Sequence, residues 1–133
     1  MIFLDSSFLI GYKIENDHHH ERALKIMKDI SSGTYGEAVF SDYVFDETLT
    51  VVFGKSKILQ EAVSLGDQLL SSALLLRVDE SVFQETFDLF REQKTKLSFT
   101  DCSIVALMRS HGVKRVATFD EEFQKVEGIE VVA

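Results

Sequence analysis

Residues 1–7 read MIFLDSS, and this short stretch already indicates the kind of fold. Its first four residues are apolar without interruption, which is typical of a strand buried on both faces, as strands of a parallel sheet are. The run ends at a carboxylate, Asp5, and Ser6 and Ser7 can cap a following helix. The chain is therefore expected to begin inside its sheet and to place an acid where the first strand ends.

Short apolar runs and helical patterns alternate along the rest of the chain. After Asp17, for example, Ala23, Ile26 and Ile30 repeat at the spacing of one buried helix face, which ends near Gly33. The predicted strands cover residues 1–5, 37–41, 74–78, 115–119 and 129–132, the run at 74–78 as a buried strand. The predicted helices start after residue 5 and cover 17–33, 42–54, 56–72, 83–92 and 100–111, with a short helix from residue 120.

This alternation predicts an α/β protein, a three-layer α/β/α sandwich around a central, mostly parallel sheet of about four to five strands. No proline, low-complexity tract or fixed repeat interrupts the chain, so one domain covering residues 1–133 is expected. Helical spacing assigns Phe83, Phe87 and Phe90 to the core rather than to a base-stacking surface.

Composition places the chain among globular proteins, with 45% hydrophobic and 27% charged residues. The single cysteine, Cys102, cannot form an internal bridge and is expected to be a buried, inert thiol. With no leader-like start and no apolar run of about 18 residues, the expected location is the cytoplasm, without membrane insertion. The net charge of -8 argues against a nucleic-acid partner, unless some of the acids gather around divalent cations.

Three acids stand where strands end or helices begin. Asp5 closes the first strand, Asp101 lies in the first turn of a helix, and Asp120 follows the strand at 115–119. In an open α/β sheet such positions surround one crevice beyond the carboxyl ends of the strands. A fourth acid, Glu47, lies on an apolar helix stripe, and places where a sequence breaks its own pattern are functional disproportionately often.

Taken singly, each acid has an ordinary explanation as a helix cap, a partner of the helix dipole or half of a salt bridge. Taken together, four acids that point into one crevice would repel one another without cations, which favours a metal site. Hard oxygen ligands indicate Mg²⁺ or Mn²⁺. Such ions activate water and stabilise the charge that develops on a phosphodiester, so phosphodiester hydrolysis is the expected chemistry.

The chain resembles the PIN-domain family over its whole length. The resemblance rests on Ile2-Phe3-Leu4-Asp5-Ser6, on Glu47, on Thr100-Asp101 and on Thr118-Phe119-Asp120, with support from the spacing of Asp17, His20 and Ala23. It implies a Mg²⁺- or Mn²⁺-dependent endoribonuclease with Asp5, Glu47, Asp101 and Asp120 as catalytic metal ligands, where Glu121 could replace Asp120. It also implies that the hydroxyls of Ser6, Thr100 and Thr118 orient the carboxylates or a water.

The resemblance implies partners as well. Many small prokaryotic members are toxins paired with an antitoxin protein, and an RNA substrate and a homodimer are expected, with the helix Ile58–Leu69 as one candidate interface. Two alternatives stay open: a catalytically silent module of the same fold that binds RNA or protein, and a phosphoryl-acceptor signalling domain. The second is disfavoured because serines, not a second acid, follow Asp5.

Two further groups of residues are not assigned to the site. His18, His19 and His20 do not share one helix face and are interpreted as a solvated helix start rather than a metal site. Lysines that flank loops could either hold RNA phosphates or be ordinary surface residues; they are Lys55, Lys57, Lys94 and Lys96.

Overall fold

The first strand, β1 (Ile2–Leu4), is the middle strand of a five-stranded sheet with the order β3-β2-β1-β4-β5. The computed structural model describes all residues 1–133. All four strand pairings are parallel, which confirms the predicted sheet. The other strands are β2 (Ala38–Ser41), β3 (Leu74–Leu76), β4 (Arg115–Ala117) and β5 (Glu130–Val132).

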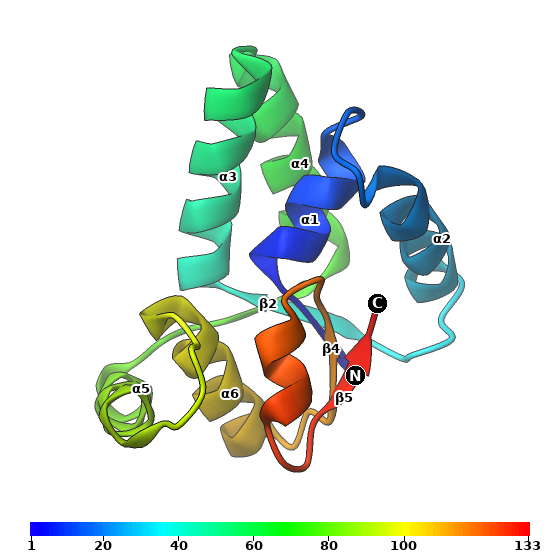
Figure 1. The fold of residues 1–133 in the computed structure, drawn as a ribbon. Helices are drawn as coiled ribbons and strands as arrows, with labels where there is room; N and C mark the ends of the chain where they lie inside the picture. Colours follow the sequence, from blue (N-terminus) through cyan, green and yellow to red (C-terminus); the bar gives the residue numbers. More distant parts are fainter.

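Helices connect the strands and cover the sheet, which makes the predicted α/β sandwich (Figure 1). In that view α1 to α4 occupy the upper half of the molecule, while α5 and α6 lie below the sheet. They are α1 (Ser6–Lys13), α2 (His20–Ser31), α3 (Asp42–Ser56), α4 (Leu59–Ser72), α5 (Glu80–Glu92) and α6 (Phe99–His111), and the short 3₁₀ helix η1 (Glu121–Lys125) precedes β5. None of these helices combines the length and hydrophobicity needed to cross a membrane.

One hydrophobic cluster of 28 buried residues holds the layers together. Ile2 and Phe3 of β1 are fully inaccessible to solvent, as expected for a strand with covered faces and a partner on each side. Gly112 ends α6 in the left-handed conformation, which is the C-cap that its position predicts. The central strand is thus fixed from both faces and both edges, and Asp5 follows it directly.

Two helices start with a different cap from the predicted one. The side chain of Asp5, rather than Ser6 or Ser7, caps α1. The side chain of Ser41 caps α3, where the sequence also suggests Asp42, the first residue of the predicted helix 42–54. An N-cap residue needs an extended backbone, and a residue that directly follows a strand already has one. In both places the strand therefore passes into the helix without an intervening loop.

Two predictions about burial are wrong. The run 74–78 is not a buried strand: β3 is an edge strand, and Leu74 is 45% exposed. Phe83, Phe87 and Phe90 are not in the core but remain 42–48% exposed. Helix α5 buries a second stripe, which includes Val82 and Thr86, and it packs mainly on α6. Periodicity shows that residues share a helix face, but it does not show which face meets the protein.

Candidate metal centre

Asp5 lies at the carboxyl end of the central strand and is only 2% exposed. Its Oδ1 accepts a hydrogen bond from the Ser6 amide at 2.7 Å. Its Oδ2 accepts from the hydroxyls of Ser7 at 3.0 Å and Thr118 at 2.7 Å. Burial raises the pKa of Asp5 although these hydrogen bonds act in the opposite direction, and the charge of Glu47 raises it further.

Glu47 comes from the second turn of α3 and is joined to Asp5 through one hydroxyl. The Ser6 side chain donates to Glu47 Oε1 and lies 3.4 Å from Asp5 Oδ1. Glu47 is exposed rather than buried on an apolar stripe, so the stripe that the sequence suggested does not extend through it. Its carboxylate therefore lies at the open rim of the crevice, where exchange with solvent costs little.

Asp101 lies in the first turn of α6, where it forms a capping box with Ser98. The Ser98 amide donates to Asp101 Oδ2 at 3.1 Å, and the Asp101 amide donates to Ser98 Oγ at 3.0 Å. Burial is the largest cause that raises the pKa of Asp101 to about 7, and the charges of Asp5 and then Asp120 add to it. Burial and the neighbouring acids thus both disfavour the charged form of Asp101.

Asp120 follows β4 and caps η1 by accepting from the Glu122 amide at 3.0 Å. Its own amide donates to Thr118 Oγ1 at 3.0 Å, and the same hydroxyl donates to Asp5. Thr118 thus links the ends of β1 and β4. Because the charge of Asp120 acts on Asp101, and Asp5 interacts with both Glu47 and Asp101, the four carboxylates form one electrostatic group.

No basic side chain neutralises this group of acids. The four salt bridges of the structure join Lys13 to Glu61, Arg91 to Asp88, Arg115 to Glu130 and Lys125 to Glu122. No three acids, histidines or cysteines converge closely enough to form a finished metal-binding group as the side chains stand. The donors nevertheless fit Mg²⁺ or Mn²⁺ in kind, because all are hard carboxylate oxygens whose charges lack compensation.

The ordinary explanations of these acids also hold, since Asp5, Asp101 and Asp120 are all capping residues. The two roles are compatible. A parallel sheet places the N-termini of its following helices at one edge, and their backbone N–H groups stabilise carboxylates there. Capping therefore explains how Asp5, Asp101 and Asp120 are held in place. The mutual repulsion of the four carboxylates explains why the crevice favours a cation.

The hydroxyls around the acids agree only in part with the prediction. Ser6 and Thr118 contact carboxylates, as expected, whereas the hydroxyl of Thr100 forms no hydrogen bond with any of them. Ser98 takes that place at Asp101, and the four-residue spacing Ser98-x-x-Asp101 was the signal for it. Ser7 was missed as a ligand-orienting residue, because a serine two positions after an acid looks like any helix start.

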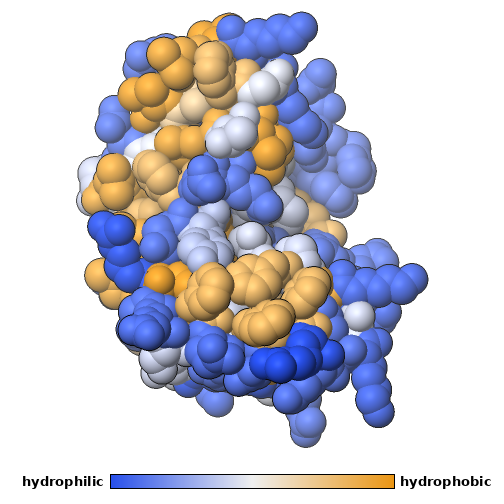
Figure 2. Space-filling view, turned by 90° about the vertical axis from the view of Figure 1, so that its left-hand side faces the viewer, coloured by the Kyte–Doolittle hydropathy of each residue, from blue (hydrophilic) through white to orange (hydrophobic).

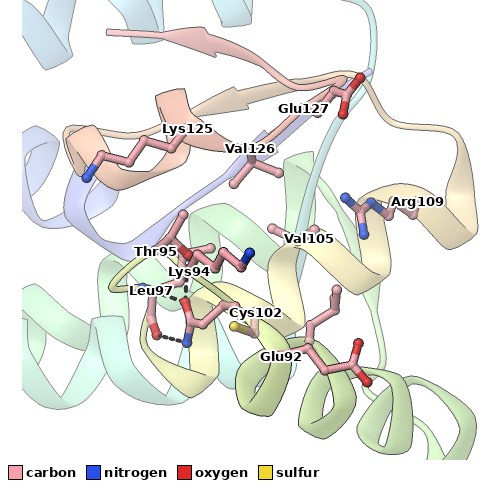
Figure 3. Close-up of a pocket in the computed structure, with 12 residues that line it drawn as sticks. Glu92, Lys94, Thr95, Leu97, Cys102, Val105, Arg109, Lys125, Val126 and Glu127 are labelled. Carbon is pink, nitrogen blue, oxygen red and sulfur yellow. Dashed lines mark hydrogen bonds between the residues drawn. The ribbon is translucent and has the colours of Figure 1, made fainter.

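A separate cavity of about 330 Å³ opens between α5, α6 and the segment after η1 (Figure 3). Its lining includes Lys94, Arg109 and Lys125 but none of the four acids. Cys102 also lines it and is otherwise buried, as predicted, and burial raises the pKa of its thiol. The cavity is thus separate from the crevice and is not part of the candidate centre.

The family model of the PIN domain matches residues 2–129. The chain belongs to the PIN-domain family. A curated relative, "Ribonuclease VapC6" from Methanocaldococcus jannaschii, is 25% identical, and the match covers 98% of this chain and 95% of the relative.

Solved structures show the same PIN fold. VapC20 of Mycobacterium tuberculosis, described as a Sarcin-Ricin loop cleaving toxin, superposes with a TM-score of 0.84 at 23% identity, covering 98% of both chains. VapBC2 of Rickettsia felis, bound to a DNA fragment from its promoter, gives a TM-score of 0.69 at 17% identity, covering 99% of this chain and 98% of that one.

We predict that the crevice destabilises the metal-free protein as the pH rises. Between the ordinary value of 3.8 and the pKa of about 7 in the folded state, Asp101 holds more protons when folded than when unfolded. The free energy of unfolding should therefore fall across this window, and Asp101→Asn should remove that part of the fall. In EDTA at pH 7.5 the variant should melt a few degrees above wild type, and near pH 4 the two should agree.

Thermal melts of both proteins from pH 4 to 8 measure this difference. Mn²⁺ provides the control, since a cation that binds only the folded state should raise the Tm of wild type more than that of Asp101→Asn. If Tm fell in parallel with rising pH for the two proteins in EDTA, Asp101 would not be the group that destabilises the metal-free protein.

Proposed function

We propose that this PIN-domain protein is a Mg²⁺- or Mn²⁺-dependent endoribonuclease that hydrolyses RNA phosphodiester bonds. One observation carries the proposal: the charges of four carboxylates from four segments act on one another at the carboxyl edge of the sheet, and none of them forms a salt bridge. The ribonuclease name of the archaeal relative, with nearly complete coverage of both chains, supports the same activity. RNA as substrate also suggests a cytoplasmic location.

The residues of this chain would divide the work between binding and orientation. Asp5, Glu47, Asp101 and Asp120 would hold the cations, which when bound activate water and stabilise charge on the phosphodiester. The hydroxyls of Ser7 and Thr118 fix Oδ2 of Asp5, so that this buried carboxylate presents one defined orientation. Ser6 positions Glu47 relative to Asp5. The rim position of Glu47 leaves it free to adjust as a cation enters.

The alternative is a silent PIN module that binds RNA or protein without cutting. Asp5 would cap α1 in a silent module too, but asparagine caps a helix equally well without placing a buried charge, 2% exposed, among like charges. The intact hydrogen-bonded support of Asp5 therefore favours the enzyme. A direct cleavage measurement separates the two.

We predict that Asp101→Asn and Glu47→Gln each lower RNA cleavage at least 100-fold while leaving the fold intact. Both changes remove a charge that binds the cation and hardly alter volume. In Asp101→Asn the side-chain amide oxygen would still accept from the Ser98 amide, which preserves that half of the capping box. Cleavage of a mixed panel of RNAs is measured with Mn²⁺, with Mg²⁺ and with EDTA.

Asp67→Asn, on the exposed side of α4, is the matched control and should cut like wild type. Wild-type protein that cuts none of the RNAs under any metal would favour the silent module. Equal cutting by wild type and Asp101→Asn would reject the assigned centre.

We further propose that the ribonuclease acts as the toxin of a toxin–antitoxin pair, with an antitoxin protein as partner. The support is the relation to proteins named VapC and the likeness to VapBC complexes. Induced expression of wild type should then arrest growth of a bacterial host, and Asp101→Asn at the same protein level should not. Normal growth with abundant, active wild-type enzyme would instead indicate a role in RNA processing.

We propose that the protein forms a homodimer through the aromatic surface of α5, defined by Phe83, Phe87 and Phe90. Figure 2 shows an apolar patch bordered by hydrophilic residues in its lower half, the level at which α5 lies in Figure 1. Phe99 at the start of α6 adjoins this surface, with ring centroids 5.6 Å from Phe83 and 5.8 Å from Phe90.

The charge around this surface bears on what could cover it. RNA is an unsuitable occupant, because residues 79–92 carry five acids and one arginine. A second copy is the better occupant, since in a two-fold contact the phenylalanines of the two copies would pack on one another, while Arg91 stays paired with Asp88 of its own helix.

The size of the surface is consistent with that occupant. The three phenylalanines, each 42–48% exposed, together offer on the order of 250–300 Å² of apolar area, enough for the centre of a standard interface of roughly 800 Å² per partner. Helix α4, the predicted interface, also has exposed apolar residues, among them Leu59, Val63 and Leu70, and is the alternative face.

We predict that Phe87→Glu converts the dimer into a monomer, because it adds a charge at the centre of the apolar contact next to four acids of the same helix. Multi-angle light scattering over a range of concentrations measures the mass. Val63→Glu, on α4, is the matched variant and should remain dimeric. The reverse pattern would move the interface to α4, and a monomeric wild type would reject the dimer.

A further inference from the structure

Three aromatic rings form a column at the edge of the acidic crevice, outside the set of residues assigned to it. The His19 ring stacks on Phe119 with centroids 4.2 Å apart and only 6° between the ring planes. The His18 ring centroid lies 3.8 Å from that of His19, with the two ring planes tilted by 39°, and His18 is exposed. Phe119 stands between Thr118, which donates to Asp5, and Asp120. The column therefore lies beside the segment that carries Thr118 and Asp120, and its outer end is in solvent.

Local contacts hold the histidines in place, so the start of α2 is not the loosely solvated segment that the sequence suggested. The Asp17 side chain accepts from the His19 amide at 2.9 Å, and His20 Nδ1 lies 2.8 Å from the Gly11 carbonyl oxygen. A Cβ added at Gly11 would lie 3.3 Å from the Phe119 ring and 3.5 Å from His19. Phe119 and His19 thus pack directly against the α1 backbone, whereas His18 keeps an accessible ring.

A hollow of about 240 Å³ lies beside the column. His19, Arg22, Phe119, Asp120 and Gln124 are among the residues that line it. The Arg22 guanidinium is held there by two hydrogen bonds to the carbonyl oxygen of Ala133, at 2.6 and 3.0 Å. Stacked rings, a cation and a neutral amide thus meet beside two acids, Asp120 and Glu121, the first of them one of the four of the crevice.

This combination has the chemistry of a site for one unpaired nucleotide. Single-stranded RNA is recognised largely by stacking of bases on aromatic and histidine side chains, while basic side chains contact the phosphates. A column that serves only to pack the protein would gain nothing from ending in an exposed histidine ring. The surface of α5, by contrast, offers aromatic rings among acids and suits a protein partner.

We propose that His18, His19 and Phe119 form a stacking subsite for a base of single-stranded RNA next to the cleaved bond, with Arg22 at its phosphate. The inference rests on the proposed ribonuclease activity, which it deepens by naming an unpaired nucleotide as the feature recognised. It assigns the histidines to binding rather than to proton transfer. Losing them should therefore affect KM far more than kcat.

The test uses a short single-stranded RNA that carries 2-aminopurine, a fluorescent base quenched by stacking, placed in turn at each position around the cut. His18→Ala and the double variant His18→Ala/His19→Ala should raise KM roughly 5- to 100-fold, with kcat within about twofold. Quenching at one position should be lost. His19→Phe keeps an aromatic ring and should retain both properties, and His111→Ala, at the far end of α6, is the control.

Each outcome bears on the proposal in a defined way. Cleavage with unchanged KM and unchanged quenching in the double variant would overturn the subsite and leave the nuclease standing. A wild type that quenches the probe through these histidines but never cuts would keep the subsite and reject the nuclease. A rise in KM that tracks a fall in Tm, or that spares quenching, would show that the column only packs the protein.

Discussion

Burial of the Asp5 carboxylate at the end of the central strand is the constraint on which the rest of the structure depends. A carboxylate with 2% exposure has to be supplied with hydrogen bonds, and here they come from the following helix and from the end of β4. That requirement explains why hydroxyl residues surround it, and why Thr118 bridges two strand ends. Because Thr118 follows β4, the pairing of β4 with β1 supplies a hydrogen bond that fixes the Asp5 carboxylate at the edge of the sheet.

The same arrangement creates a deficit of positive charge. Parallel topology places several helix starts at one edge of the sheet, and each start favours an acid for its own local reason. Burial, and then the charges of the neighbouring acids, raise the pKa of Asp101 to about 7. A divalent ion would offset that repulsion, so the feature that weakens the metal-free protein is the one that would serve the proposed catalysis.

Much of this could be predicted from the sequence, because periodicity is a local property. The apolar run before Asp5 and the stripe Ala23, Ile26 and Ile30 each indicate an element from neighbouring residues alone, and the alternation of elements indicates the parallel sheet. The acids could be found because they break that pattern or end it. That these acids together bind a cation is a proposal, which the electrostatic coupling between them supports.

What could not be predicted depends on contacts between distant segments. The aromatic stripe on α5 has helical spacing, but only the packing of α5 on α6 decides that its Val82 face is buried and its phenylalanines are not. Ser7 and His19 show their roles only when the end of β4 lies against them, through the Phe119 amide and the Phe119 ring.

The net charge of -8 is the strongest argument against an RNA substrate, and the distribution of charge answers it. The acids of α5 surround one aromatic surface and would repel phosphates, whereas the other surface adjoins Arg22 as well as Asp120 and Glu121 at the edge of the crevice. Phosphates would therefore be attracted to this side when cations occupy the crevice and offset its acids. On the proposals above, RNA would bind at the edge that holds cations and would be excluded from α5 by its acids. The two aromatic surfaces would then differ in partner because only one of them adjoins a site for cations, not because they differ in hydrophobicity.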